Sequence, residues 1–426
     1  MPSGHQRSGP FIAAALFVAV LIPAPAVHAQ STTTGVFSQF VDFETKLTSW
    51  SGGRGFPTTL ALTPGSRARG HLWYTSAGGR ATYERSGRYL IELTGRFGYY
   101  SARQSLPGIA TSTFAGPSDS VLGARMTLQN LQGWQPFIGI SVNVPTGDAI
   151  LSQAQRYARM DRDLVGVGNY GEGLNVAVTG GAGFPITESI AGSLAATVTW
   201  ADSYRRDSAS AIGIQVAPVV QRFNPGESLS LAANLNGQHG AFSWSLGGSY
   251  TIEDSNKVNG QVVTRIGHSL ALSATGGWRW AENALANVSL SYQMTNRNET
   301  VPIPPGALIR ETSNSNADVF SASIDQWFGY EDWTFGGGFS YRRRFDNGWP
   351  PGDQRFIAGH DRIGLSLAAK RQITAALDVT LRAERIWMRY DAQPVANAGP
   401  GTVPNSSAPR LLIHGWQVAL GAGMKF

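Results

Sequence analysis

The dominant pattern of this chain is a strict alternation of apolar and polar positions. At the C-terminus every second residue is apolar or aromatic and the intervening residues are small or polar, the apolar set being Trp416, Val418, Leu420, Ala422, Met424 and Phe426. A period of two is that of a β-strand whose two faces meet different environments. The pattern therefore predicts a terminal strand with an apolar face that ends on an aromatic residue.

The same alternation recurs from Val36 onward in segments of about ten residues separated by turn residues, as transmembrane β-barrels require. A soluble β-sandwich is the alternative, but its outer strand faces tolerate charge, whereas the alternate faces here are apolar and aromatic. We therefore predict an all-β fold, a single antiparallel up-and-down transmembrane barrel. The clearest segments are 189–200, 242–252, 285–294, 332–341 and 377–383.

Connector lengths support this interpretation, because bacterial barrels combine short periplasmic turns with long external loops. The two kinds alternate along the chain. Short connectors are expected at 132–133, 185–187, 238–240, 281–283 and 329–330, and long ones at 102–118, 145–171, 298–315, 345–359 and 391–409.

The number of strands follows from parity. About 17 segments qualify, whereas a bacterial barrel with both ends in the periplasm closes with an even number. The segment 212–223 is the weakest, since Pro218 removes a ladder donor, so we assign it to an external loop. Sixteen strands result, with 14 to 18 as the range. The first strand is Val36 to Leu47, and an N-terminal plug within residues 30–59 is the alternative.

The N-terminus has the form of a secretory signal peptide. Arg7 precedes an apolar run from Phe11 to Ile22, which is shorter than the roughly 20 residues of a membrane-spanning helix. A small-x-small site follows at 27–29 and predicts cleavage after Ala29. The domain organisation expected is a signal peptide, 1–29, and one barrel, 30–426, in the cell outer membrane.

Composition excludes several other classes. The chain has no Cys, so neither disulfides nor thiolate zinc sites are expected, and no other spacing suggests a metal or a cofactor. The net charge of +6 is spread along the chain rather than clustered, which argues against a nucleic-acid partner. The 51 glycines suit the bends and close backbone approaches of a barrel wall.

Tryptophans fall near the ends of the predicted strands, where membrane barrels place interfacial aromatic girdles. We predict girdle positions for Trp50, Trp134, Trp200, Trp278, Trp280, Trp327, Trp333 and Trp387.

The polar faces predict a charged lumen, since an interior of this size is hydrated. Cations are slightly in excess, and basic rings favour anions in pores, so anion preference is a hypothesis. The expected pore-lining residues are Arg96, Arg125, Arg279, Arg342, Lys370 and Arg382, with Glu92, Asp325 and Asp378.

The long connector 145–171 contains a charged run that would suit a constriction. If the connector folds into the lumen, its eyelet would be formed by Arg156, Arg159, Asp161, Arg162 and Asp163. A solvated surface loop is the alternative interpretation.

Two motifs resemble a group of proteobacterial outer-membrane transporters that includes proteins linked to aromatic-compound degradation: FIGISVNVPTG at 137–147 and NYGEGLN at 169–175. The resemblance implies solute uptake and transfers no binding residues. The terminal strand resembles that of Gram-negative outer-membrane barrels, which implies that Phe426 is the signal for the barrel-assembly machinery. Outer-membrane lipids are the other expected partner.

The sequence bears on three further functions. An enzyme is not expected, because the five histidines after Ala29 form no Ser/His pair on one face and are interpreted as incidental surface residues, so no catalytic residue is named. A plugged transporter for hydrophobic solutes, of the fatty-acid or aromatic-compound type, and a receptor or adhesin acting through external loops remain alternatives. The favoured function is passive or weakly selective passage of small solutes; the solute and the formation of a homo-oligomer are left open.

Overall fold

The fold is almost entirely β-structure. The computed structural model describes residues 36–52, 68–85, 87–105, 110–129, 131–152, 155, 157–167, 170–207, 220–302, 305–351, 353, 355–391, 393–394, 407–408 and 412–426. The signal peptide, its cleavage site and Arg156 lie outside these residues. Within them, no helix has the length and apolar character needed to cross a membrane.

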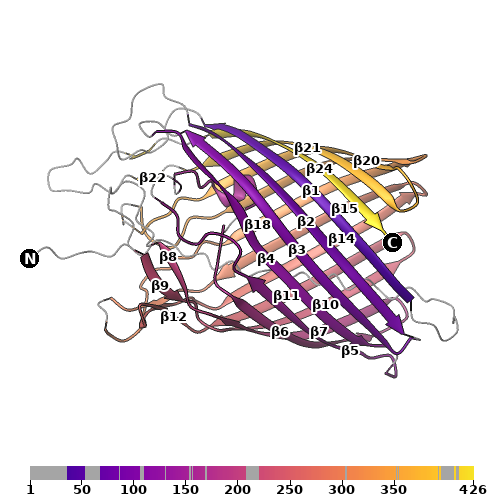
Figure 1. Cartoon of the computed structure of the whole chain (residues 1–426), viewed down its shortest axis with the longest axis horizontal. Helices are drawn as coiled ribbons and strands as arrows, with labels where there is room; N and C mark the ends of the chain where they lie inside the picture. Colours follow the sequence, from indigo (N-terminus) through magenta and orange to yellow (C-terminus); the bar gives the residue numbers. More distant parts are fainter. Residues whose placement is uncertain are drawn as a thin grey trace, which may run out of the picture.

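Sixteen antiparallel strands close into one barrel, which confirms both the fold class and the strand number (Figure 1). Each strand pairs with its neighbour in chain order, and β1 closes the barrel by pairing with β24. The strands are β1 Val36–Gly52, β2 Arg69–Arg85, β3 Tyr89–Ser105, β4 Ser112–Leu128, β5 Gln135–Val144, β6 Asn175–Pro185, β7 Ile190–Ala201, β10 Ser228–His239, β11 Phe242–Glu253, β14 Ser269–Ala281, β15 Ala284–Thr295, β18 Val319–Tyr330, β19 Trp333–Arg344, β20 His360–Gln372, β21 Leu377–Tyr390 and β24 Leu412–Lys425.

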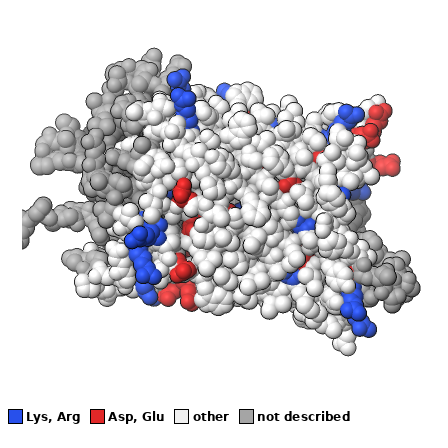
Figure 2. Space-filling view, in the orientation of Figure 1, with Lys and Arg blue, Asp and Glu red and all other residues white. Residues whose placement is uncertain are grey.

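The outer surface of the barrel is apolar. Large hydrophobic side chains are exposed at alternate positions of most barrel strands, as lipid contact requires. The space-filling view shows a largely uncharged band between two ends where charged side chains gather (Figure 2). The molecule is thus an outer-membrane type of β-barrel, with outward residues such as Phe43, Trp73, Phe97, Ile138, Leu194, Leu246, Leu290, Ile324, Phe339, Leu367, Leu381 and Trp416.

The two ends of the barrel differ, as the connector lengths predict. The tight turns and the C-terminus lie at one end, and the longer connections lie at the other (Figure 1). Six short strands extend the wall beyond that second end as a separate sheet: β8 Tyr204–Asp207, β9 Val220–Asn224, β12 Ser255–Val258, β13 Gln261–Arg265, β16 Glu299–Thr300 and β17 Ile309–Arg310. A further pair, β22 Gln393–Pro394 and β23 Ser407–Ala408, stands apart.

The connectors agree with the prediction at one segment and differ from it at another. The segment 212–223 was assigned to an external loop. Its last residues belong to β9, which lies outside the barrel, as expected. The prediction of a long loop at 102–118 was wrong, because β3 continues to Ser105 and β4 begins at Ser112. The strands β1 to β4 have 17 residues each, longer than the rest of the barrel, so their loop-side ends were mistaken for loop.

The girdle prediction was wrong for two tryptophans. Trp50 points inward and is 5% exposed, with its indole N–H donating to Met160 Sδ over 3.3 Å. Trp327 also points inward, donates to Asp325 Oδ2 over 2.6 Å and fills the space above Gly336. Both lie on the inward parity of their strands, and a position near a strand end does not reveal which face carries the ring. Trp134, Trp200, Trp278 and Trp280 are exposed.

The closure of the barrel explains why the C-terminal strand alternates and ends on an aromatic residue. Phe426 exchanges both backbone hydrogen bonds with Gln39 of β1, at 2.9 and 3.1 Å, and its ring is 68% exposed. The stretch 36–52 is therefore part of the wall, while the rest of the 30–59 segment lies outside the described residues.

Candidate constriction of the lumen

The inner surface of the barrel has two walls of different chemistry. On β7, β10, β11 and β14 the inward positions hold Ser, Thr, Ala, Gly, Asn and Gln, except for Glu253 and Arg279 at strand ends. The wall formed by β19, β20, β21, β24, β1, β2, β3 and β4 is charged instead. We call these the neutral wall and the charged wall; the second holds Asp42, Glu44, Lys46, Arg80, Glu92, Arg96, Arg125, Arg342, Arg344, His360, Arg362, Lys370, Asp378, Arg382 and Glu384.

Many charges of the charged wall are paired. Lys370 meets Asp378 at 3.2 Å and Arg362 meets Glu384 at 2.9 Å. Glu92 pairs with Arg80 and also lies 4.0 Å from Arg125, whose guanidinium covers the Phe137 ring. Since these groups face a hydrated interior, they escape the roughly 2 to 4 kcal/mol that Lys or Arg costs on the lipid face.

Several cations of the charged wall keep their charge unpaired. No carboxylate among the described residues lies within ion-pair distance of Lys46, Arg96 or Arg382. Arg382 pairs in register with Ala419 of β24, which pairs with Lys46 of β1, so one small residue separates the two cations. Lys46 is also in electrostatic range of Arg362, Glu44 and Glu384. A positive strip, neutralised in part by Glu44 and Glu384, therefore crosses this wall.

The connector 145–171 enters and leaves the lumen through a tight neck. Gly147 and Gly171 pack backbone against backbone, and a Cβ on Gly171 would lie 2.6 Å from the Gly147 carbonyl carbon. The Asp119 carboxylate joins the two chains, accepting from Gly147 N at 2.8 Å and Glu172 N at 2.6 Å. These are the glycines of the Pro-Thr-Gly and NYGEGLN motifs. Glycine is required there because no side chain fits between the two backbones.

Beyond the neck, the connector folds inward and packs on the charged wall. Its apolar residues Leu151, Ala158, Met160, Leu164, Val165, Val167 and Tyr170 form one buried cluster with the wall residues Trp50, Leu72, Tyr100, Ala102, Phe114, Ile386, Met388 and Ile413. The Tyr170 ring lies 4.5 Å from that of Tyr100 and 5.3 Å from that of Phe114. Apolar burial on this scale fixes the connector against the wall rather than leaving it in solvent. We call residues 145–171 the inner loop.

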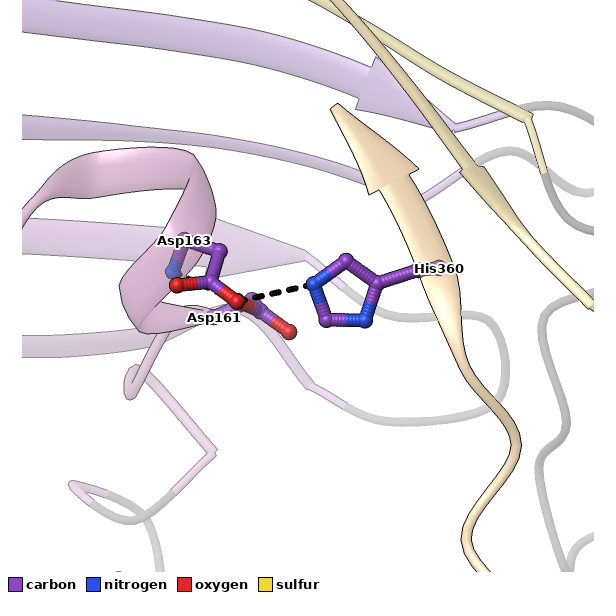
Figure 3. Close-up of side chains that lie close together, drawn as sticks. All are labelled: Asp161, Asp163 and His360. Carbon is purple, nitrogen blue, oxygen red and sulfur yellow. Dashed lines mark hydrogen bonds and ion pairs between the residues drawn. The ribbon is translucent and has the colours of Figure 1, made fainter. Parts of the chain in front are cut away.

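A polar contact completes the anchoring at the short helix α2 Arg162–Val165. Asp161 is its N-cap and accepts from Asp163 N at 2.7 Å, and Gly166 ends the helix in the left-handed conformation with φ 74°. Figure 3 shows Asp161 and Asp163 beside His360 of β20. His360 Nε2 donates to Asp163 Oδ2 at 2.9 Å, and Tyr390 Oη donates to Asp161 Oδ2 at 2.6 Å.

Asp163 is also held by a cation of the wall. Arg342 Nε lies 3.0 Å from Asp163 Oδ1, so the two oxygens of this carboxylate face a guanidinium and an imidazole. Burial opposes ionisation of Asp163, but the hydrogen bond from His360 and the charge of Arg342 prevail and lower its pKa below the ordinary 3.8. We call Asp161, Asp163, Arg342, His360 and Tyr390 the latch.

The latch has donor atoms that would suit a metal ion, because ligand atoms of Asp161, Asp163 and His360 lie within 4.8 Å of one another. The Asp163 oxygens are already engaged by His360 and Arg342, and the Arg342 guanidinium supplies the positive charge that an ion would bring. The arrangement therefore fits a latch between loop and wall better than a cation site.

The described residues of the predicted site lie at inward positions of the barrel strands and on the inner loop. Arg342 and Asp163 come from two separate predictions and are in direct contact. Asp161 and Asp163 face the wall, whereas Arg159 and Arg162 are exposed on the inner loop. Arg96, Arg125, Lys370, Arg382, Glu92, Asp325 and Asp378 occupy inward positions, and Arg279 is exposed at the end of β14. Asp325 accepts from Asn287 at 2.8 Å.

Sequence reasoning missed the partners of the inner loop. His360 was interpreted as an incidental surface residue, and that was wrong: it is 3% exposed. Arg362 and Tyr390 were also not named. Glu384 fits because Gly364 leaves room beside Ser340, where a Cβ would meet its carboxylate. The only available signal was that these residues occupy the inward parity of β20 and β21.

Asp163 makes the anchoring of the inner loop dependent on pH. Because its pKa is lowered, the ionised carboxylate stabilises the latch fully above about pH 3.8, and this contribution is lost as pH falls through the lowered pKa. We expect steady single-channel currents at pH 7 and flickering currents near pH 3. The currents of the Asp163→Asn variant should flicker at both pH values, since the variant loses about 1.5 to 3 kcal/mol of charge-assisted hydrogen bonding. Steady currents from this variant at pH 7 would contradict the assignment.

Comparison with known proteins returns solved outer-membrane protein structures at low sequence identity. A scan of protein-family models found no match, and a search of curated proteins found no significant match. An outer membrane channel from Pseudomonas putida F1 is 11% identical, with 95% of this chain and 100% of that chain covered and a TM-score of 0.32. Acinetobacter baumannii OccAB1 is 11% identical over 92% and 97%, with a TM-score of 0.43. A Pseudomonas aeruginosa FadL homologue is 9% identical over 91% and 90%, with a TM-score of 0.43.

Proposed function

We propose that this barrel is an outer-membrane channel for small hydrophilic solutes, with a preference for anions, and that the inner loop sets the width of its lumen. The observation that carries the proposal is the inner loop itself, which is tied at its neck, packed through an apolar cluster and latched to the charged wall. A barrel of this size leaves an aqueous channel unless loops fill it, so a fixed loop inside defines a constriction.

Electrostatics at the same level support the preference for anions. Arg342 and Arg362 are directly opposite in register on β19 and β20, an arrangement that is unfavourable for like charges unless anions neutralise it. Asp163 and Glu384 neutralise them in part. Lys46 and Arg382 add positive charge beneath the loop, and Lys46 Nζ lies next to Gly166 at the end of α2. A passing anion would be attracted to this strip.

The alternative of a plugged transporter for hydrophobic solutes finds less support. Residues 36–52 form a strand of the wall, and the apolar cluster inside the barrel is filled by the inner loop itself. The inward positions of the neutral wall are polar or small, which suits hydrated solutes.

The test is conduction by the refolded protein in a planar bilayer under a KCl gradient. We expect stable channels whose reversal potential has the sign of chloride preference. A potassium preference would overturn the proposed selectivity. The absence of any conductance would overturn the proposal that the barrel is a channel. Small organic anions should reduce the chloride current as they enter the lumen.

A further inference from the structure

Basic side chains also gather on the outside of the barrel, at the end with the long connections. On β2, Trp73 is exposed and Leu72 is buried inside, so His71 and Arg69 share the outward parity of Trp73. On β3, Phe97 and Tyr99 are exposed and Tyr100 is buried, so Arg103 points outward. Arg69, His71 and Arg103 are themselves exposed. None of these residues takes part in the lumen.

The register joins these residues into one outward row. Arg385 of β21 pairs with Trp416 of β24, which pairs with Ser49 of β1; Ser49 pairs with His71 of β2, which pairs with Arg103 of β3. With strands about 4.8 Å apart, the row is roughly 19 Å long. The small Ser49 lies at its centre, and Arg69 lies two residues from His71 on β2. We call Arg69, His71, Arg103, Arg385 and Trp416 the outer row.

Aromatic residues lie in this row and on both sides of it along the barrel axis, with Trp387 two residues nearer the long connections than Arg385. The Arg385 guanidinium lies 4.8 Å from the centre of the Trp416 ring and 5.6 Å from that of Trp387. Trp73 and Tyr99 are two and four residues nearer the middle of the barrel than His71 and Arg103. Aromatic rings mark the boundary between hydrocarbon and headgroups, so the basic groups of β2 and β3, above Trp73 and Tyr99, reach the headgroup layer, and Arg385 lies at the level of the Trp416 ring.

The outer row carries net positive charge. No described carboxylate lies within ion-pair distance of Arg69, Arg103 or Arg385, whereas Arg343 of β19 and Arg389 of β21 are neutralised by Asp361 and Asp391. A transmembrane strand needs about 9 to 11 residues, so the 17-residue strands β2 and β3 extend past the hydrocarbon. Unpaired arginines at this height favour a phosphate partner, since guanidinium groups bind phosphate oxygens bidentately.

We propose that the outer row binds the phosphorylated glucosamine headgroup of lipid A in the outer leaflet. Long connections face the cell exterior in bacterial barrels, which places the row in that leaflet. Arg69, Arg103 and Arg385 bind the phosphates, and Trp73, Tyr99 and Trp416 contact the upper parts of the acyl chains. Basic clusters of this kind recognise anionic lipid headgroups in other membranes by the same electrostatics.

The test uses hexa-acylated lipid A with both phosphates as the probe, added to the refolded barrel in detergent and followed by native mass spectrometry. We expect the wild-type protein to retain lipid A and to bind the same lipid much less after phosphatase treatment. The triple variant Arg69→Gln/Arg103→Gln/Arg385→Gln should bind at least about tenfold more weakly, because each arginine supplies charge-assisted hydrogen bonds. Arg371→Gln is the matched control, since Arg371 also points outward over a tryptophan, Trp333, but at the opposite end.

Three results would overturn the proposal: equal affinity of the triple variant, equal binding of dephosphorylated lipid A, or the same loss in Arg371→Gln. If the outer row were instead an interface between two copies of the chain, the wild-type protein would be a dimer without lipid and the triple variant a monomer, which would also overturn it. Unchanged conductance of the triple variant verifies that the barrel has folded.

Discussion

Replacing residues 149–168 with a short Gly-Ser linker is expected to raise the single-channel conductance at least about twofold, because an unobstructed barrel of this size has a wide aqueous lumen. The linker can close the gap, since Gly147 and Gly171 already touch at the neck. The barrel should still form, because its strand pairing does not involve the inner loop. Thermal stability should fall, since Trp50, Leu72 and Tyr100 lose their apolar cover.

The control for this experiment is a deletion of similar kind outside the lumen. Removing the tip of the β12–β13 hairpin, residues 257–262, shortens an external connection that belongs to a sheet outside the barrel. Its conductance should equal that of the wild-type protein. An unchanged conductance in the inner-loop variant, measured on folded protein, would exclude the constriction while leaving the barrel assignment intact.

The second large effect is expected from Lys46→Gln/Arg382→Gln, which removes two unpaired cations beneath the inner loop. At a few ångströms, each unit charge is worth about 1 kcal/mol or more to a passing ion. That amount corresponds to roughly a fivefold change in the ratio of anion to cation permeability. The reversal potential in a KCl gradient should therefore move toward cation preference while the conductance stays of similar size.

The matched control is Arg385→Gln. It removes one arginine from the same strand as Arg382 but from the outward face, so the selectivity should stay at the wild-type value. Measurements at about 0.1 M salt are needed, because the Debye length is then about 10 Å and the effect is not screened. Equal shifts in the two variants would show that the lumen charges do not set selectivity.

Most of the barrel was predictable because its determinants are local. A strand between lipid and water must alternate its residues, so the lipid face of β24 can be identified from Trp416 to Met424 without any knowledge of its neighbours. Turn residues and the parity rule then determine the number of strands, and Pro218 was sufficient to remove one false candidate. Alternation also placed Arg342, Lys370 and Arg382 on the inward parity.

The inner loop was only half predictable. Its length and charged run singled out Asp161 and Asp163, but the two glycine motifs gave only a resemblance, and the neck that they form was not predicted. Its partners are another matter: Asp163 and His360 are 197 residues apart, and Asp161 and Tyr390 are 229 apart. The sequence around one residue of each pair contains no information about the position of its partner. Trp50 illustrates the same limit, since a tryptophan near a strand end suits a girdle and an inner-loop cluster equally well.

The sequence by itself determined that the chain is a barrel, how many strands it has and which face of most strands meets lipid, because these depend on alternation within one segment and on turns between adjacent segments. Only the tertiary structure decided which charges meet. Closing the sheet sets the register of every strand pair, which brings Arg385 to Arg103 into one outer row and Arg342 beside His360 and Asp163. Contacts across a closed cylinder depend on all the registers together, and no single segment contains that information.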